Sequence, residues 1–160
     1  MKARAYSIAS AIVVAGLALF VAPANADISA NVLKAFKGQI IVSQGPLLDA
    51  DSDKATIAAY KAQQLKVVTG AENDDDVTAW HFHYTAFLKK KGFTTLTLQF
   101  HAGDAYLADQ QLNGVDRSAT VIEGDISLSE DDGLKKNKDY TLKLVSDTDV
   151  VVAVTTLRLE

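Results

Sequence analysis

The sequence predicts a mainly β fold, an antiparallel β-sandwich with one short helix near residues 53–65. Three observations lead to this prediction. Short segments of alternating apolar and polar residues recur in the second half of the chain, and turn residues such as Asn113, Gly114 and Gly124 separate them. Only one stretch after the N-terminal region has an apolar period near 3.6 residues with strong helix formers. Short strands spaced in this way are typical of sandwiches.

The first 26 residues have the composition of a cleaved export signal. Lys2 and Arg4 give a positive start, residues 8–21 form an uncharged apolar run, and Ala24 and Ala26 supply a small-residue cleavage site. We therefore predict a signal peptide over 1–26 and a single sandwich domain over 27–160, located in the periplasm or secreted. No later stretch is long and apolar enough for a membrane span, so none is predicted after cleavage.

Composition excludes several classes of protein. The chain has 16 basic residues, 20 acidic residues and no cysteine, which excludes a disulfide scaffold and a thiolate metal site. Without the signal the net charge is −6 with His neutral. Nucleic acid is not expected as a partner, because the dense basic runs at 89–91 and 135–138 are interpreted as solvated hairpin tips.

The first half of the predicted domain contains one strand and one helix. Residues 38–44 form a strand around Ile40–Val42, which Gly45 and Pro46 terminate. The helix near 53–65 begins after a cap at Asp51, Ser52 or Asp53. Residues 28–37 fit a second short helical segment or an extended one.

Two strongly alternating segments follow the acidic stretch at 72–76. Trp80–Leu88 and Phe93–His101 both carry apolar side chains at even-numbered positions, and Lys89–Gly92 have the composition of a turn. We predict that the two segments form a hairpin. Trp80 and Tyr84 belong to its apolar face and are expected in the core, whereas Tyr106 is a candidate for stacking on sugars if exposed.

Further strands are expected at 105–107, 119–122 and 125–129, and a late pair at 140–145 and 150–159 turns at Asp147 and Thr148. Leu134 stands six residues before Tyr140, and the chain alternates after it. This pattern resembles the tyrosine corner of fibronectin type III and immunoglobulin-like domains. The resemblance covers the last quarter of the chain and implies an immunoglobulin-like/fibronectin III-like sandwich, in which the Tyr hydroxyl bonds back to the backbone. As a packing motif it implies no activity.

All three histidines fall on the mixed face of the predicted hairpin. With a three-residue turn, His81 lies directly across from His101, and opposed Cβ atoms are about 4.5 to 5.5 Å apart. We predict His81, His83 and His101 as a candidate site for Zn(II) or Cu(II), completed by a carboxylate or water. The alternative is an ordinary polar sheet face.

Calcium is the other metal for which the sequence offers candidate ligands. Asp49, Asp51 and Asp53 imitate the start of a calcium loop, but Lys54 stands where Gly is required and Tyr60 where Glu should chelate, which excludes an EF-hand. The acidic segments 72–76 and 130–132 are candidate Ca(II) loops or solvated turns. No organic cofactor is predicted.

The sequence predicts an exported, non-catalytic binding or interaction module whose partner is a protein or a glycan outside the cytoplasm. It contains no thiol, no nucleophile elbow and no Gly-rich phosphate loop. The first alternative is a metal-binding protein that uses the three histidines. The second is a secreted hydrolase with paired carboxylates or a histidine-bound metal, which requires His81 and His101 to lie inside a cleft.

Overall fold

Strands dominate the chain, as the alternating segments predict. The computed structural model describes residues 28–72 and 76–160, and the predicted signal peptide lies outside these residues. The helices are α1 (Ala30–Phe36) and α2 (Asp53–Gln63), with a single 3-10 turn, η1, at Glu130–Asp132. The strands are β1 (Ile40–Ser43), β2 (Val67–Val68), β3 (Ala71–Glu72), β4 (Thr78–Phe87), β5 (Thr95–Ala102), β6 (Ala105–Asn113), β7 (Val121–Ser129), β8 (Lys138–Ser146) and β9 (Val151–Leu159).

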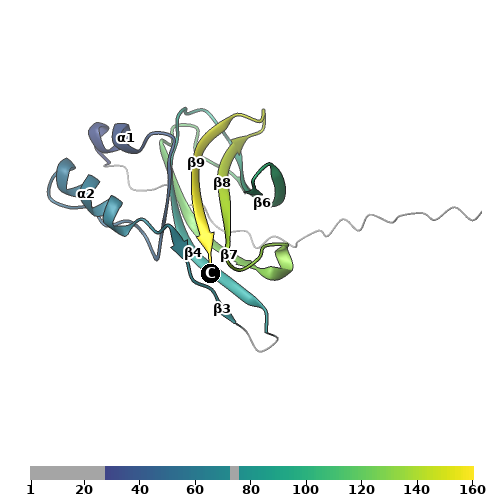
Figure 1. The fold of residues 1–160 in the computed structure, drawn as a ribbon. Coiled ribbons are helices and arrows are strands. Elements are labelled where there is room, and N and C mark those ends of the chain that lie inside the picture. Colours follow the sequence, from purple (N-terminus) through teal and green to yellow (C-terminus); the bar gives the residue numbers. More distant parts are fainter. Residues whose placement is uncertain (1–27, 73–75) are drawn as a thin grey trace, which may run out of the picture.

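The strands form two sheets. In the first sheet, β4 pairs with β7 along one edge and with β1 and β3 along the other. The second sheet has the order β2-β9-β8-β5-β6. Every pairing of named strands is antiparallel except that of the two-residue β2 with β9. Figure 1 shows β8 and β9 together, with α1 and α2 to one side of the strands.

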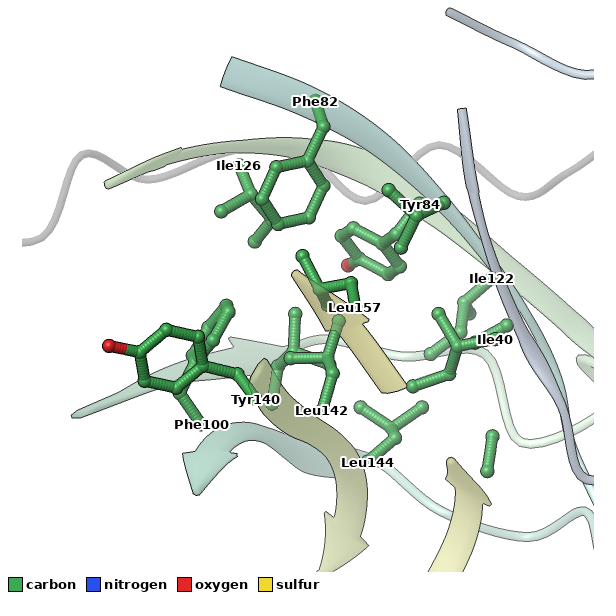
Figure 2. Packing of buried hydrophobic residues seen from close by; sticks show 14 of the residues in the cluster. Ile40, Phe82, Tyr84, Phe100, Ile122, Ile126, Tyr140, Leu142, Leu144 and Leu157 are labelled. Carbon is green, nitrogen blue, oxygen red and sulfur yellow. The ribbon is translucent and has the colours of Figure 1, made fainter. Parts of the chain in front are cut away.

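The main core lies between the two sheets and takes one face of each. On β4 the even-numbered side chains, from Trp80 to Ala86, point inward, as the alternation predicts. Figure 2 shows Phe82 and Tyr84 on one side of this core and Leu142 and Leu144 on the other. Trp80 is fully buried, and its indole Nε1 donates to the carbonyl oxygen of Glu160 at 3.0 Å. The prediction that Trp80 and Tyr84 belong to the core is confirmed.

The helices cover the outer face of the first sheet. A second buried cluster joins Val32 and Phe36 of α1 and Tyr60 of α2 to Ile41, Phe87 and Val121 of the sheet. Asn31 of α1 donates to the carboxylate of Asp53 at 2.7 Å, which links the two helices. Ser52 caps α2 as predicted, and α2 ends at Gln63, two residues before the predicted end. The prediction of one helix was incomplete, since residues 30–36 form a second one.

The predicted hairpin of Trp80–Leu88 with Phe93–His101 was wrong. Strand β4 pairs with β7 in the first sheet, whereas β5 pairs with β6 and β8 in the second. The segment that connects β4 to β5 crosses from one sheet to the other, and its backbone forms hydrogen bonds with other parts of the chain. Leu88 N donates to Thr120 O at 2.8 Å and Lys89 N to Val152 O at 3.0 Å. The hairpin of β5 turns instead at Gly103 and Asp104 into β6.

Gly124 lies inside a strand and does not separate two of them. Strand β7 runs unbroken through it, and Gly124 pairs with Tyr84 on β4. A Cβ atom added at Gly124 would lie 3.0 Å from the Tyr84 ring. The glycine therefore makes room for a core aromatic side chain, and the predicted strands at 119–122 and 125–129 merge into one.

The local prediction at Tyr140 is confirmed. Its hydroxyl accepts from Lys135 N at 2.7 Å and donates to Lys135 O at 3.2 Å. Leu134 and Tyr140 are both buried in the main core. The late pair of strands also forms as expected, because β8 turns at residues 147–149 to pair with β9. Among residues 28–72 and 76–160, no helix is long and apolar enough to cross a membrane.

Candidate functional site

The three histidines lie on the outer faces of two different sheets. His81 and His83 belong to β4 in the first sheet, where they pair with Ser127 and Asp125 of β7. His101 belongs to β5 in the second sheet and pairs with Tyr106 and Thr141. The predicted opposition of His81 and His101 was therefore wrong. The cleft that the hydrolase alternative requires between these two residues is likewise not formed.

His83 has a carboxylate near each ring nitrogen. Its Nδ1 lies 3.0 Å from Asp125 Oδ1, and its Nε2 lies 3.7 Å from Glu123 Oε2. The residue is only 4% exposed, and Nε2 has no hydrogen-bond partner. Thr85, which pairs with Glu123 across the strands, also has a buried hydroxyl without a hydrogen-bond partner. His83 thus lies in a covered polar site, whereas its neighbour His81 is exposed.

The polar environment of His83 extends to α2 through Glu123. The hydroxyl group of Tyr60 in α2 donates a hydrogen bond to the carboxylate of Asp49. Burial raises the pKa of Tyr60, and the hydrogen bond and charge of Asp49 and the charge of Glu123 raise it further. Tyr60 therefore stays protonated at neutral pH, and its hydroxyl acts as a hydrogen-bond donor on the side of α2 that faces the first sheet.

The metal predictions remain predictions. In the described part of the chain, no three His, Cys, Asp or Glu side chains form a group suited to a metal ion. The acidic segments have hydrogen-bond partners instead: Glu130 accepts from Thr78 N at 3.1 Å and Asp132 from Ser129 N at 2.8 Å. Residues 73–75 of the other acidic segment lie outside the described residues, and Glu72 pairs with Lys136 at 2.9 Å.

The outer face of the second sheet differs from that of the first because neither described helix packs on it. The two helices contribute to the cluster on the first sheet alone. Cross-strand rows of polar side chains run over β6, β5 and β8: Gln111 beside Thr97, Asp109 beside Gln99 and Lys143, and Tyr106 beside His101 and Thr141. We call these eight residues the open face. Their side chains are half-buried or exposed.

Tyr106 is the aromatic side chain of the open face. It is 52% exposed, and its ring meets that of His101 edge to face at a centroid distance of 5.8 Å. Burial, followed by the hydrogen bond and charge of Asp109, raises the pKa of Tyr106. The phenol is therefore neutral at physiological pH and presents a flat ring with a polar end.

His101 packs against Tyr106 from the neighbouring strand β5. Its Nε2 lies 3.1 Å from Gln99 Oε1. Burial lowers the pKa of His101, and the charge of Lys143 lowers it further, against an opposing effect of Asp104. The imidazole is therefore mainly neutral at pH 7. The open face thus combines an aromatic ring with amide, hydroxyl, carboxylate and ammonium groups on three neighbouring strands.

Sequence reasoning singled out His83 and His101 as metal ligands and Tyr106 as a stacking residue, but it did not identify the other residues of either site. Glu123 and Asp125 are odd-numbered residues of β7, as His83 is of β4, and parity would have matched them once β7 was recognised as the partner strand. Nothing in the local pattern of β4 identifies that partner. For Tyr106, its aromatic character beside a turn was the available signal.

Comparisons with known proteins are sparse. No family model matches the sequence, and a search of curated proteins gives no match. Among solved structures, the chain is similar to a β-glucosidase from Kluyveromyces marxianus in complex with glucose, at 12% identity and a TM-score of 0.31. The match covers 59% of this chain and 14% of that chain. A likeness at this level has no bearing on function.

Proposed function

We propose that the protein is an exported, non-catalytic binding module that contacts a glycan partner in the periplasm or outside the cell. The observation that carries the proposal is the exposed ring of Tyr106 on the uncovered outer face of the second sheet. Of the two partner classes expected from the sequence, protein and glycan, this ring favours the glycan. An aromatic ring with a polar end suits a ligand that has apolar faces and many hydroxyl groups.

The other residues of the open face match the chemistry of a saccharide. In one row, Gln99 supplies an amide, the Asp109 carboxylate can accept hydrogen bonds from hydroxyl groups, and the Lys143 ammonium can donate hydrogen bonds to them. The strands fix the backbone positions of these residues, so their polar groups stand in rows across the sheet before a ligand binds. Polar rows that run across three strands fit an extended chain laid across them. Catalysis of glycoside hydrolysis instead needs two carboxyl groups on either side of one bond.

The proposal also covers the cellular location of the protein and the type of its sandwich fold. The predicted signal over residues 1–26 supports export, and the tyrosine corner at Tyr140 supports a sandwich of the immunoglobulin-like or fibronectin III-like kind. Binding modules outside the cytoplasm commonly use such sandwiches.

Titration calorimetry with a panel of saccharides tests the proposal. We expect cellohexaose, chitohexaose, xylohexaose or maltohexaose to bind the mature protein, and Tyr106→Ala to weaken the affinity about tenfold, or ~1.4 kcal/mol. Tyr106→Phe keeps the ring and is expected to retain most of the affinity. Leu48→Ala, which removes a 70% exposed apolar side chain elsewhere, is the control. Binding that is equal in Tyr106→Ala and wild type, or absent for the whole panel, contradicts the glycan assignment.

A second candidate function is metal binding at His83. The supporting observation is the buried Nε2 atom of His83, which lacks a hydrogen-bond partner and lies 3.7 Å from Glu123 Oε2. Asp125 beside Nδ1 corresponds to the carboxylate that commonly orients a metal-binding imidazole. Zn(II) and Cu(II) are the metals expected from the sequence.

Calorimetry with Zn(II) and Cu(II) separates this candidate from the first. We expect His83→Ala and Glu123→Gln to lose binding, while His81→Ala and His101→Ala keep it. If the wild type binds neither metal more tightly than His83→Ala does, the metal function is excluded.

A further inference from the structure

A lysine-lined groove lies at the end of the first sheet, away from the open face. Its cavity volume is about 300 Å³, and it runs between α1 and the segment that leaves β4. Leu33, which is half-buried, and the small exposed parts of Phe87 and Leu88 form the apolar part of its lining, which we call its floor. Lys34 of α1, the C-cap residue Lys37 and the run Lys89–Lys91 also line the groove, and we call these five lysines its rim.

The fold holds this rim in place by backbone hydrogen bonds. Lys89 N donates to Val152 O at 3.0 Å, and Gly92 N to Arg117 O at 2.9 Å, so both ends of the lysine run are fixed. The aliphatic part of Lys89 lies over Gly38, where an added Cβ atom would be 2.6 Å from Lys89 Cε. The run is therefore part of the tertiary structure and is not the hairpin tip that the sequence suggested.

The charge of the groove opposes that of the whole protein. The chain has a net charge of −4, yet no Asp or Glu lines the groove. In the described residues, the ion pairs of Lys and Arg involve only Lys136 and Arg158, so the five rim lysines have no ion-pair partner there. A bound anion would supply the counter-charge that these five ammonium groups lack among the described residues.

We propose that the lysine-lined groove binds a small amphipathic anion, an alkyl or acyl chain with a carboxylate or phosphate head. The chain lies on the floor and the head among the ammonium groups. The apolar floor argues against a fully hydrated polyanion, and the volume is at the lower end of the range for small-molecule sites, about 300 to 1,000 Å³. Phe87 and Leu88 are buried and do not project, so they are poorly suited to insertion into a bilayer.

The direct test is calorimetry of the mature protein with decyl phosphate below its micelle concentration. We expect saturable binding that weakens as salt is added, and binding at least tenfold weaker for inorganic phosphate and for decanol. A triple variant, Lys34→Gln with Lys37→Gln and Lys90→Gln, is expected to lose at least tenfold in affinity. The matched control replaces the other lysine run, with Lys135→Gln, Lys136→Gln and Lys138→Gln, and is expected to bind as the wild type does.

Three outcomes would overturn the inference. Equal losses in the two triple variants would show a diffuse charge effect, and inorganic phosphate binding as tightly as decyl phosphate would show a simple anion site. Binding to phosphatidylglycerol vesicles without binding to monomeric decyl phosphate would show a membrane surface site. The substituted lysines are exposed, and thermal unfolding of each variant checks that the fold is retained. Saccharide binding at the open face is expected to be unchanged, which keeps this test independent of the proposed function.

Discussion

At the scale of single residues, Tyr140 joins the loop after η1 to the second sheet. Its buried hydroxyl both accepts from and donates to the backbone of Lys135. Tyr140→Phe removes both bonds and leaves a backbone N–H without its acceptor. We expect the free energy of unfolding to fall by about 1–3 kcal/mol, measured by urea denaturation. Tyr106→Phe, which removes a hydroxyl from an exposed ring, is expected to change it by less than about 0.5 kcal/mol.

His101 makes stability depend on pH. Burial and the charge of Lys143 hold its pKa below the ordinary value of 6.5, so the unfolded chain binds the proton more strongly than the folded one. The stabilisation from neutral His101 is therefore complete above pH 6.5 and is lost as pH falls toward its folded pKa. Urea denaturation at several pH values is expected to show the wild type losing its advantage over His101→Gln as the pH falls below 6.5. A constant difference between the two proteins would contradict this assignment.

Single residues could be predicted from the sequence wherever alternation or a local motif decided their surroundings. The inward faces of Trp80 and Tyr84 follow from alternation, and the hydrogen bonds of Tyr140 are those that the resemblance to the tyrosine corner implied. The carboxylates beside His83 come from a strand about 40 residues later in the chain. No local pattern encodes such a contact.

At the scale of elements, alternation showed which face of a strand is buried but not which strand is its neighbour. Strands β4 and β5 have the same parity because both face one core, and they do so from opposite sheets. Lys89–Gly92 have turn composition yet connect the two sheets. The late pair β8 and β9 was predicted correctly because its turn at residues 147–149 is short enough to determine the pairing.

The helical layer depends on Phe87 at the end of β4. Its ring centroid lies 5.2 Å from that of Phe36 and 6.1 Å from that of Tyr60, so it contacts both helices. Phe87→Ala is expected to reduce the free energy of unfolding by about 3–5 kcal/mol through the cavity it leaves. Hydrogen exchange of α1 and α2 amides is expected to accelerate more than exchange in β8. The exposed Leu48→Ala is the control, and equal acceleration in all elements would argue against a separate helical layer.

At the scale of the whole molecule, the two outer faces differ in what covers them. The helices pack on the outer face of the first sheet, where His83 lies between Glu123 and Asp125, while the second sheet leaves the open face to solvent. The lysine-lined groove at the end of the first sheet adds a third surface, which is basic, to an otherwise acidic protein. Composition gave the overall charge, but the sequence could not show that α1 and the β4–β5 connection bring five lysines together.

Export of the protein and cleavage of its predicted signal peptide can be measured directly. If residues 1–26 are an export signal, protein recovered from the periplasm or the medium begins at Asp27, as N-terminal sequencing or intact mass would show. Ala26→Leu removes the small residue at the cleavage site and is expected to leave unprocessed precursor. Recovery of the exported protein with Met1 still present would contradict the assignment.

The proposed function concerns the open face, and mapping of backbone amide NMR shifts during saccharide titration tests it most directly. With the best-binding hexasaccharide of the panel, we expect the largest shifts around His101, Tyr106 and Lys143 on β5, β6 and β8, and small shifts in α1, α2 and β7. Shifts concentrated on the helices or at the lysine-lined groove, with those three residues unaffected, would contradict the account.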